Sequence, residues 1–284
     1  YFGDGDEMHM NFHFPLMPRL FMALARGDRQ PIVDILARTP KLPKYCQWGT
    51  FLRCHDELTL EMVTPEERQW MWETYSPDPK QRINLGIRRR LAPLLDNDLR
   101  KNLMMNSMLL TMIGSPFLYY GDEIGMGDDI SLFDRNGVRT PMQWDASPSA
   151  GFSDAPKDKW YSPVISDEVY GYEKVNVEAQ EADPNSLLKQ LRHMIKVRKQ
   201  YPLFGWAEFE WLDFTEGKQT VVAYKREWEG DYFIVLNNLI DQDVHGTLPA
   251  DAPEYLDVLT GETIKAGDYT LPPYGFVWLK PVGE

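Results

Sequence analysis

The chain has 284 residues, 43% of them hydrophobic, which is enough for one large domain or two smaller ones. Its net charge of −13, from 30 Lys and Arg against 43 Asp and Glu, disfavours nucleic acids and anionic membranes as partners. No run approaches the roughly 18 consecutive apolar residues of a membrane span, and the opening residues show no signal-peptide pattern.

The two cysteines, Cys46 and Cys54, lie eight positions apart on one predicted strand and its exit, where they cannot easily bridge. Free thiols fit a reducing compartment, so we expect a cytoplasmic protein. The chain opens on Tyr1 and not on an initiator Met, and we therefore expect it to be the C-terminal portion of a longer protein.

The first predicted strand covers residues 8–14 and ends at Pro15, and helical patterns follow over 16–26 and 31–37. His9 and His13 lie on this strand, where histidines are more often hydrogen-bonded core residues than functional ones. A short, largely apolar run over 46–52 then predicts a buried parallel strand.

Polar residues follow this second strand at once. Arg53, His55, Asp56 and Glu57 stand where the strand ends. Parallel α/β folds place their chemistry at the carboxyl ends of strands, so this cluster is the first candidate site.

Further helices and a third strand come after the cluster. Thr64 is the expected N-cap of a helix over 66–75, with Pro at its first position. The basic run 81–90 has two open interpretations: arginines that hold a long loop, or an arginine at the mouth of an acidic pocket. A Met-rich helix over 99–113 predicts core packing, and a strand over 116–121 follows it.

The later chain contains a long loop, a last helix and a region of short strands. The loop, 127–152, is too long to be a mere connector and contains Arg139 and Trp144. An indole in such a loop is more often its anchor, so we expect Trp144 to anchor the loop. After a helix over 187–201, short apolar runs between turn signals predict an antiparallel sandwich, with strands at 219–224, 231–238 and 275–279.

Four blocks in order resemble the α-amylase family, retaining α-glucoside enzymes on a (β/α)8 barrel. The blocks are 51–63, 86–94, 117–125 and the heptapeptide 139–145. The first, with His55-Asp56-Glu57-Leu58-Thr59-Leu60-Glu61, is similar to the branch of trehalose synthases, which interconvert maltose and trehalose. One departure is Cys54, where the family usually has Asn; the thiol is only a weak hydrogen-bond donor.

The resemblance implies roles for five residues. Asp56 would stabilise the oxocarbenium-like transition state by holding two hydroxyls of the sugar at the cleavage point. His55, Arg139, Glu57 and Glu61 would bind substrate. Glu57 and Glu61, together with Arg139 on the facing loop, would close the pocket on its acceptor side through an arginine–carboxylate contact. Asp122 and Glu123, after the third strand, would support the top of the barrel without touching the sugar.

The resemblance also implies the fold. We expect an α/β chain made of the C-terminal part of a (β/α)8 barrel, about strands six to eight, over residues 1–203, and a β-sandwich over 204–284. A retaining glycosidase needs a nucleophile and an acid/base carboxylate, and in this family both come from earlier strands. A complete barrel takes about 250 residues, so we expect both carboxylates before Tyr1 and no activity from the chain alone.

The implied activity is intramolecular transglucosylation between maltose and trehalose. An α-glucosidase or oligo-1,6-glucosidase is the alternative enzyme, and a non-catalytic sugar-binding or interaction piece is the alternative of another class. We expect no cofactor in this chain, any structural calcium belonging to the part before Tyr1. Small sugars are the expected partners, and both a homo-oligomer and a fused maltokinase-like domain are compatible with the sequence.

Overall fold

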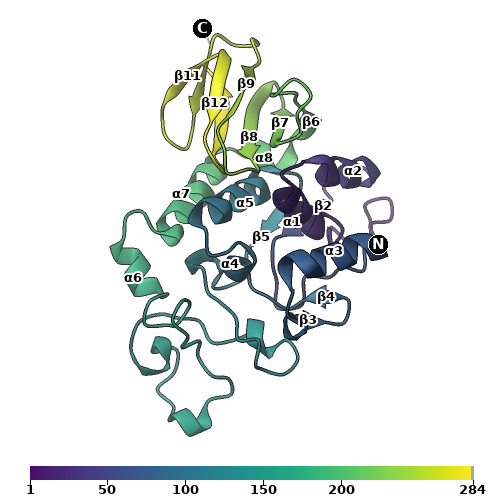
Figure 1. Cartoon of the computed structure of the whole chain (residues 1–284). Coiled ribbons are helices and arrows are strands. Elements are labelled where there is room, and N and C mark those ends of the chain that lie inside the picture. The colour runs from purple at the N-terminus through teal and green to yellow at the C-terminus, as the bar shows by residue number, and fades with distance from the viewer. Residues whose placement is uncertain (283–284) are drawn as a thin grey trace. The chain divides into compact units, whose positions relative to one another are not determined.

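A computed structural model describes residues 1–282 and divides them into two compact units. Unit 1 comprises residues 1–50, 104–116 and 193–282, and unit 2 comprises 51–103 and 117–192. Figure 1 shows the elements of both units along the chain. The expected division into domains at residues 203 and 204 stays a prediction.

Three short strands form the barrel-like sheet, in the order β1-β2-β5. Strand β1 (Met10–Phe12) pairs in parallel with β2 (Gln47–Phe51), and β5 (Ser115–Phe117) lies on the other side of β2. Gly114 fits beside β2 because a Cβ there would approach the Trp48 carbonyl oxygen to 2.4 Å. The three strands that the sequence predicts therefore form, although each is shorter than expected.

The five predicted helices begin and end close to their predicted limits, and three short ones, α4 (Leu91–Leu94), α6 (Val177–Ala182) and α8 (Leu203–Trp206), were not predicted. Helix α3 (Pro65–Tyr75) opens with a complete capping box between Thr64 and Glu67. The buried methionines of α5 (Leu99–Thr111) confirm the predicted core stripe. The remaining α-helices are α1 (Leu16–Arg26), α2 (Gln30–Arg38) and α7 (Leu187–Gln200).

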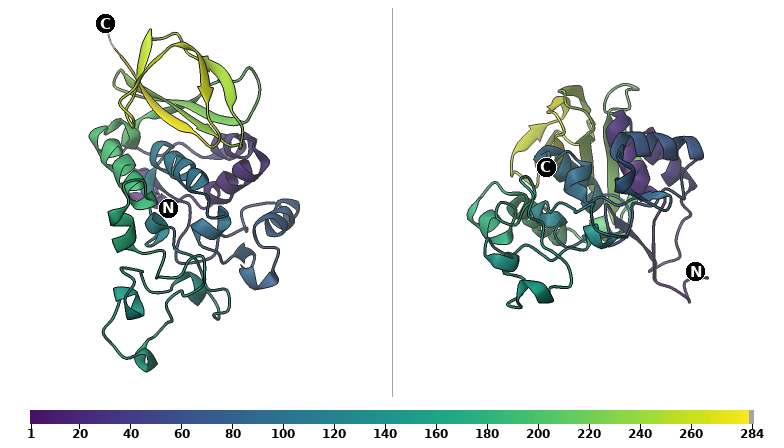
Figure 2. Two further views of the ribbon diagram at one scale, coloured as in Figure 1. Left: turned by 60° about the vertical axis from the view of Figure 1, so that its left-hand side comes forward. Right: turned by 60° about the horizontal axis from the view of Figure 1, so that its bottom comes forward.

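The C-terminal strands form two antiparallel sheets. One has the order β11-β10-β13-β8-β7-β6, and the other pairs β12 with β9. Figure 2 shows these strands as a layered β structure. The sequence predicted only three of them, because the others are short or partly exposed. Their bounds are β6 (Glu208–Trp211), β7 (Val221–Trp228), β8 (Asp231–Asn238), β9 (Val244–Leu248), β10 (Glu254–Asp257), β11 (Thr263–Lys265), β12 (Gly267–Leu271) and β13 (Phe276–Pro281).

Within unit 1 the second half of α5 is bonded to this sandwich. The buried Trp278 donates its indole N–H to Ser107 Oγ at 2.9 Å, and the Tyr224 hydroxyl meets Thr111 Oγ1 at 2.6 Å. The buried Arg226 guanidinium donates to the carbonyls of Thr111 and Met112. Each of these buried polar groups is thus paired across the contact.

Unit 2 consists largely of loops that follow β2 and β5. A two-stranded ribbon, β3 (Arg82–Ile83) with β4 (Gly86–Ile87), lies in the first of them. Single 3-10 turns punctuate the loops: η1 (Pro79–Gln81), η2 (Asp122–Ile124), η3 (Asn136–Val138), η4 (Pro148–Gly151) and η5 (Lys157–Lys159). No helix among the described residues is long and apolar enough to cross a membrane.

Candidate functional site

The segment after β2 turns sharply and is held against β4. Leu58 and Ile87 exchange backbone hydrogen bonds of 2.8 and 3.0 Å. Residue 86 must be glycine, because a Cβ there would come within 2.5 Å of Glu57 Cγ and 2.6 Å of the Leu58 carbonyl oxygen. This close packing fixes the backbone that carries His55, Asp56 and Glu57.

An arginine from the long loop meets two of these side chains. Arg135 donates through Nε to Asp56 Oδ1, and its Nη2 lies 2.9 Å from Glu57 Oε2. A third pair joins Arg135 Nη1 to Asp134 Oδ1 at 2.7 Å. Glu57 also accepts a hydrogen bond of 3.0 Å from Asn84 Nδ2. The structure thus brings Asp56 and Glu57 together around Arg135, a residue that the sequence analysis did not select.

The carboxylate of Asp56 is held in its charged form. Burial opposes ionisation, but hydrogen bonds with Glu57 and Arg135 outweigh it and keep the pKa of Asp56 well below its usual range. The hydrogen bond to Asp56 is also the largest of the interactions that raise the pKa of Arg135. The Asp56 side chain is 40% exposed, so part of this carboxylate stays accessible to a hydroxyl group of a ligand.

The other expected site residues lie apart from this cluster. Arg139 donates from Nε to the backbone carbonyl of His55 at 2.7 Å, and the side chains of both residues are exposed. Glu61 is exposed as well, and within residues 1–282 it forms no ion pair with Arg135 or Arg139. The arginine–glutamate contact that was expected of Arg139 is therefore made by Arg135.

Beneath the cluster lies a group of buried arginines and aspartates. Arg89 pairs with Asp128 at 2.9 Å, and Arg90 pairs with Asp122 at 3.3 Å. Burial raises the pKa of Asp122 to about 6, against the opposing effect of Arg90 and Arg53. The Arg90 guanidinium carbon also lies over the rings of Tyr119 and Tyr120, 4.7 and 4.8 Å from their centres. These arginines hold loops, which is the first of the two interpretations of the basic run.

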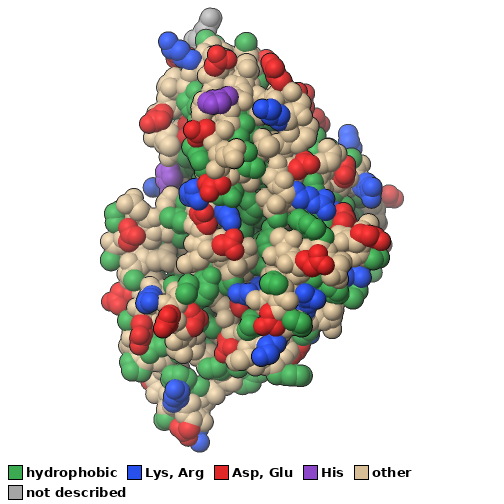
Figure 3. Space-filling view, viewed as in Figure 1, with side chains coloured by type: hydrophobic (Ala, Val, Ile, Leu, Met, Phe, Trp, Pro, Cys, Tyr) green, Lys and Arg blue, Asp and Glu red, His purple; other side chains and the backbone are tan. Residues whose placement is uncertain are grey.

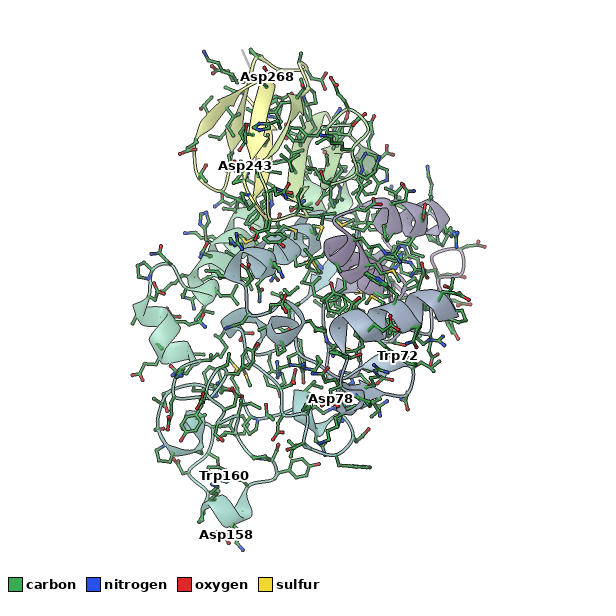
Figure 4. The ribbon with its side chains drawn as sticks, viewed as in Figure 1. Trp72, Asp78, Asp158, Trp160, Asp243 and Asp268 are labelled. Carbon is green, nitrogen blue, oxygen red and sulfur yellow. The ribbon has the colours of Figure 1, made fainter. Side chains whose placement is uncertain are left out.

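A cavity of about 680 Å³ opens along the long loop and contains Arg139 but not Asp56. Its wall is mostly aromatic and apolar. Trp144 is one of the lining residues and is 49% exposed, and our expectation that it anchors the loop stays a prediction. Trp160 lines the same cavity, and its indole N–H donates a hydrogen bond to the Ala155 carbonyl at 2.8 Å. Figure 4 shows Trp160 beside Asp158.

The remaining side chains that could act as metal ligands occur singly in the part of the chain that the structure describes. Cys46 and Cys54 are free, and the Cys54 thiol points to the Asp56 carbonyl at 3.8 Å. Among the described residues no group of three or more His, Cys, Asp or Glu could hold a metal ion. Acidic and basic side chains are mixed over the face in Figure 3, with no continuous basic patch for a polyanion.

Two family models match the chain in sequence order. Residues 87–207 match the α-amylase catalytic domain, and residues 212–278 match the C-terminal domain of maltogenic amylases. The second match falls on the antiparallel sandwich, and the first includes β5 and the long loop.

Curated relatives are similar over most of the chain. The trehalose synthase of Pimelobacter sp. is 54% identical over 239 residues, which are 83% of this chain and 41% of the relative. The trehalose synthase/amylase of Mycobacterium tuberculosis is 48% identical over 295 aligned positions, 99% of this chain and 49% of the relative. The chain spans about half the length of these relatives.

A solved structure shares the fold. The α-amylase from H. orenii superposes with a TM-score of 0.67 at 21% identity, over 98% of this chain and 50% of that protein. The expected fold class, part of an α-amylase-type barrel followed by an antiparallel β domain, is therefore confirmed.

Proposed function

Since the chain belongs, with the trehalose synthases, to the α-amylase family, we propose that it is part of an enzyme that interconverts maltose and trehalose. The reaction would be an intramolecular transglucosylation with retention at the anomeric carbon. We place the nucleophile and the acid/base carboxylate in the part of the enzyme that precedes Tyr1. Residues 1–203 would then form the C-terminal part of the same barrel.

The observation that carries the proposal is the ionised, half-open carboxylate of Asp56 after β2. A carboxylate accepts hydrogen bonds from two neighbouring hydroxyls of a glucosyl unit, and these bonds strengthen as positive charge develops on the ring. The Arg135 Nε–H occupies one oxygen of Asp56. Substrate hydroxyls would therefore replace this donor while Arg135 keeps Glu57.

The remaining site residues would retain the freed glucose. Isomerisation requires that glucose stays beside the glucosyl-enzyme while water is excluded, so the acceptor side must close. His55 and Arg139, joined through the His55 carbonyl, would line the sugar pocket. Glu57, held by Arg135, would belong to the closure, and exposed Glu61 would join it when the loop closes on substrate.

The test uses the full-length protein that contains this chain. We expect maltose to yield mostly trehalose with a minor share of glucose, and Asp56→Asn to lower kcat far more than it raises KM. A variant within twofold of the wild-type kcat would remove Asp56 from the site. Release of glucose as the main wild-type product would replace the proposal by the α-glucosidase alternative.

A further inference from the structure

Arg53 is a buried cation whose donors end on backbone oxygens. It is 2% exposed, donates from Nε to the Arg89 carbonyl at 2.6 Å, and donates from Nη2 to the Asp56 carbonyl at 2.7 Å. Among residues 1–282 it forms no ion pair, and its Nη1 has no hydrogen-bond partner. A buried guanidinium without a paired carboxylate costs stability.

Arg88 holds the backbone next to Arg135 in a similar way, by donating hydrogen bonds to carbonyl oxygens. Its guanidinium donates to the carbonyls of Leu132 at 2.6 Å and Asp134 at 2.7 Å, and to that of Ile130 at 2.9 Å. Residue 134 immediately precedes Arg135, so Arg88 fixes the backbone from which the Arg135 side chain extends.

The two arginines act on one short piece of chain. Arg53 donates a hydrogen bond to the carbonyl of residue 89, and Arg88 directly precedes residue 89 in the chain. The backbone of Asp56 and the backbone before Arg135 are thus both tied to the two-residue segment 88–89, the first through Arg53 and the second through the side chain of Arg88.

We propose that Arg53 and Arg88 are positioning residues that set the Asp56 carboxylate against Arg135 and the reacting sugar. The proposal rests on the function proposed for Asp56. Neither arginine needs to touch substrate. Misplacing a reacting group by about 1 Å can cost about a hundredfold in rate, so two bonds to the backbone of the site have a large effect on turnover.

Lysine is the informative replacement because it keeps the charge and loses the planar fork. One ammonium group at position 53 cannot reach both carbonyls with the same geometry, and one at position 88 cannot span three. For the full-length enzyme we expect Arg53→Lys and Arg88→Lys each to lower kcat at least about tenfold, with KM for maltose changed less than about threefold.

A matched control is Arg82, another arginine of unit 2 that donates to backbone carbonyls. Its Nε bonds the Ser76 carbonyl at 2.8 Å, away from Asp56 and Arg135. Arg82→Lys should leave kcat within about twofold of wild type.

A double-mutant cycle decides between positioning and general structure. If Arg53 acts through Asp56, then Arg53→Lys should change kcat by less than about twofold in an Asp56→Asn background. An equal loss in both backgrounds would overturn the inference. Retention of the wild-type kcat by Asp56→Asn alone would instead overturn the proposed function, and this inference with it.

If Arg53→Lys does not fold, which the loss of a cooperative melting transition would show, a second double-mutant cycle tests the inference. Arg88 is only partly buried, and Arg88→Lys should fold. Its effect on kcat should vanish in an Arg135→Met background, because the side chain that it positions is then absent. Full additivity of Arg88→Lys and Arg135→Met would overturn the inference.

Discussion

Replacing Arg135 by Met should raise the share of glucose among the products of maltose. Of the three carboxylates that Arg135 meets, Glu57 is the least exposed, at 12%, and Arg135 itself is 22% exposed. Asp56 and Asp134 are 40% and 36% exposed, so solvent weakens those pairs more. We therefore assign most of the closing energy, about 1 kcal/mol, to the Arg135–Glu57 pair.

That energy converts directly into product partition. At 1.36 kcal/mol per tenfold, loss of about 1 kcal/mol lowers the ratio of trehalose to glucose about fivefold. In the proposed reaction both products arise from one glucosyl-enzyme, so the ratio should not depend on how much active enzyme is present. The assay is chromatographic separation of glucose and trehalose at early times. Arg135→Lys, which keeps the charge, should give a smaller change.

The same substitution should shift the pH dependence. The hydrogen bond from Arg135 lowers the pKa of Asp56, so its removal raises that pKa. The carboxylate is required in its charged form, and the acid limb of kcat/KM should therefore move to higher pH. An unchanged product ratio together with an unchanged acid limb would refute the assigned role of Arg135.

Three further outcomes are expected of the full-length protein. Arg139→Ala should also raise the glucose share, measured as above, because the residue that fixes the His55 carbonyl is lost. Burial raises the pKa of Asp122 from 3.8 to about 6, so between these pH values the native state keeps a proton that the unfolded chain releases. The free energy of unfolding therefore falls as pH rises through this range. Asp122→Asn should remove that fall, as measured by urea titrations at several pH values. Gly86→Ala should lower the urea midpoint, because its Cβ meets the backbone of Leu58, whereas Gly205→Ala, with open space around it, should not.

The sequence predicts local structure well where a local rule governs it. Thr64, Pro65 and Glu67 form the expected helix start because capping needs only four neighbouring residues. The strand before His55 is readable because its apolar run is followed at once by polar residues. The family blocks, likewise, are contiguous segments, and they place Asp56 after β2 without any knowledge of its partners.

Contacts between distant segments could not be predicted in this way. Arg135 lies 79 positions after Asp56 in a loop without periodicity. Arg53 appeared as one polar residue of a cluster, yet it is buried, since its partners are carbonyls that any sequence could supply. A signal for Arg135 would have been the turn Asp134-Arg135-Asn136-Gly137, which projects a long side chain from a fixed backbone.

The bonds between α5 and the sandwich bear on how proteins of this kind can be recombined. Exchanging residues 208–281 for a β domain without Trp278, Tyr224 and Arg226 at the matching positions would remove the donors and acceptors that meet Ser107, Thr111 and Met112. A chimaera would then bury orphaned hydroxyl and carbonyl groups on the helix. The unit of exchange is therefore the sandwich together with the second half of α5, two segments that are separate along the chain and inseparable in a graft.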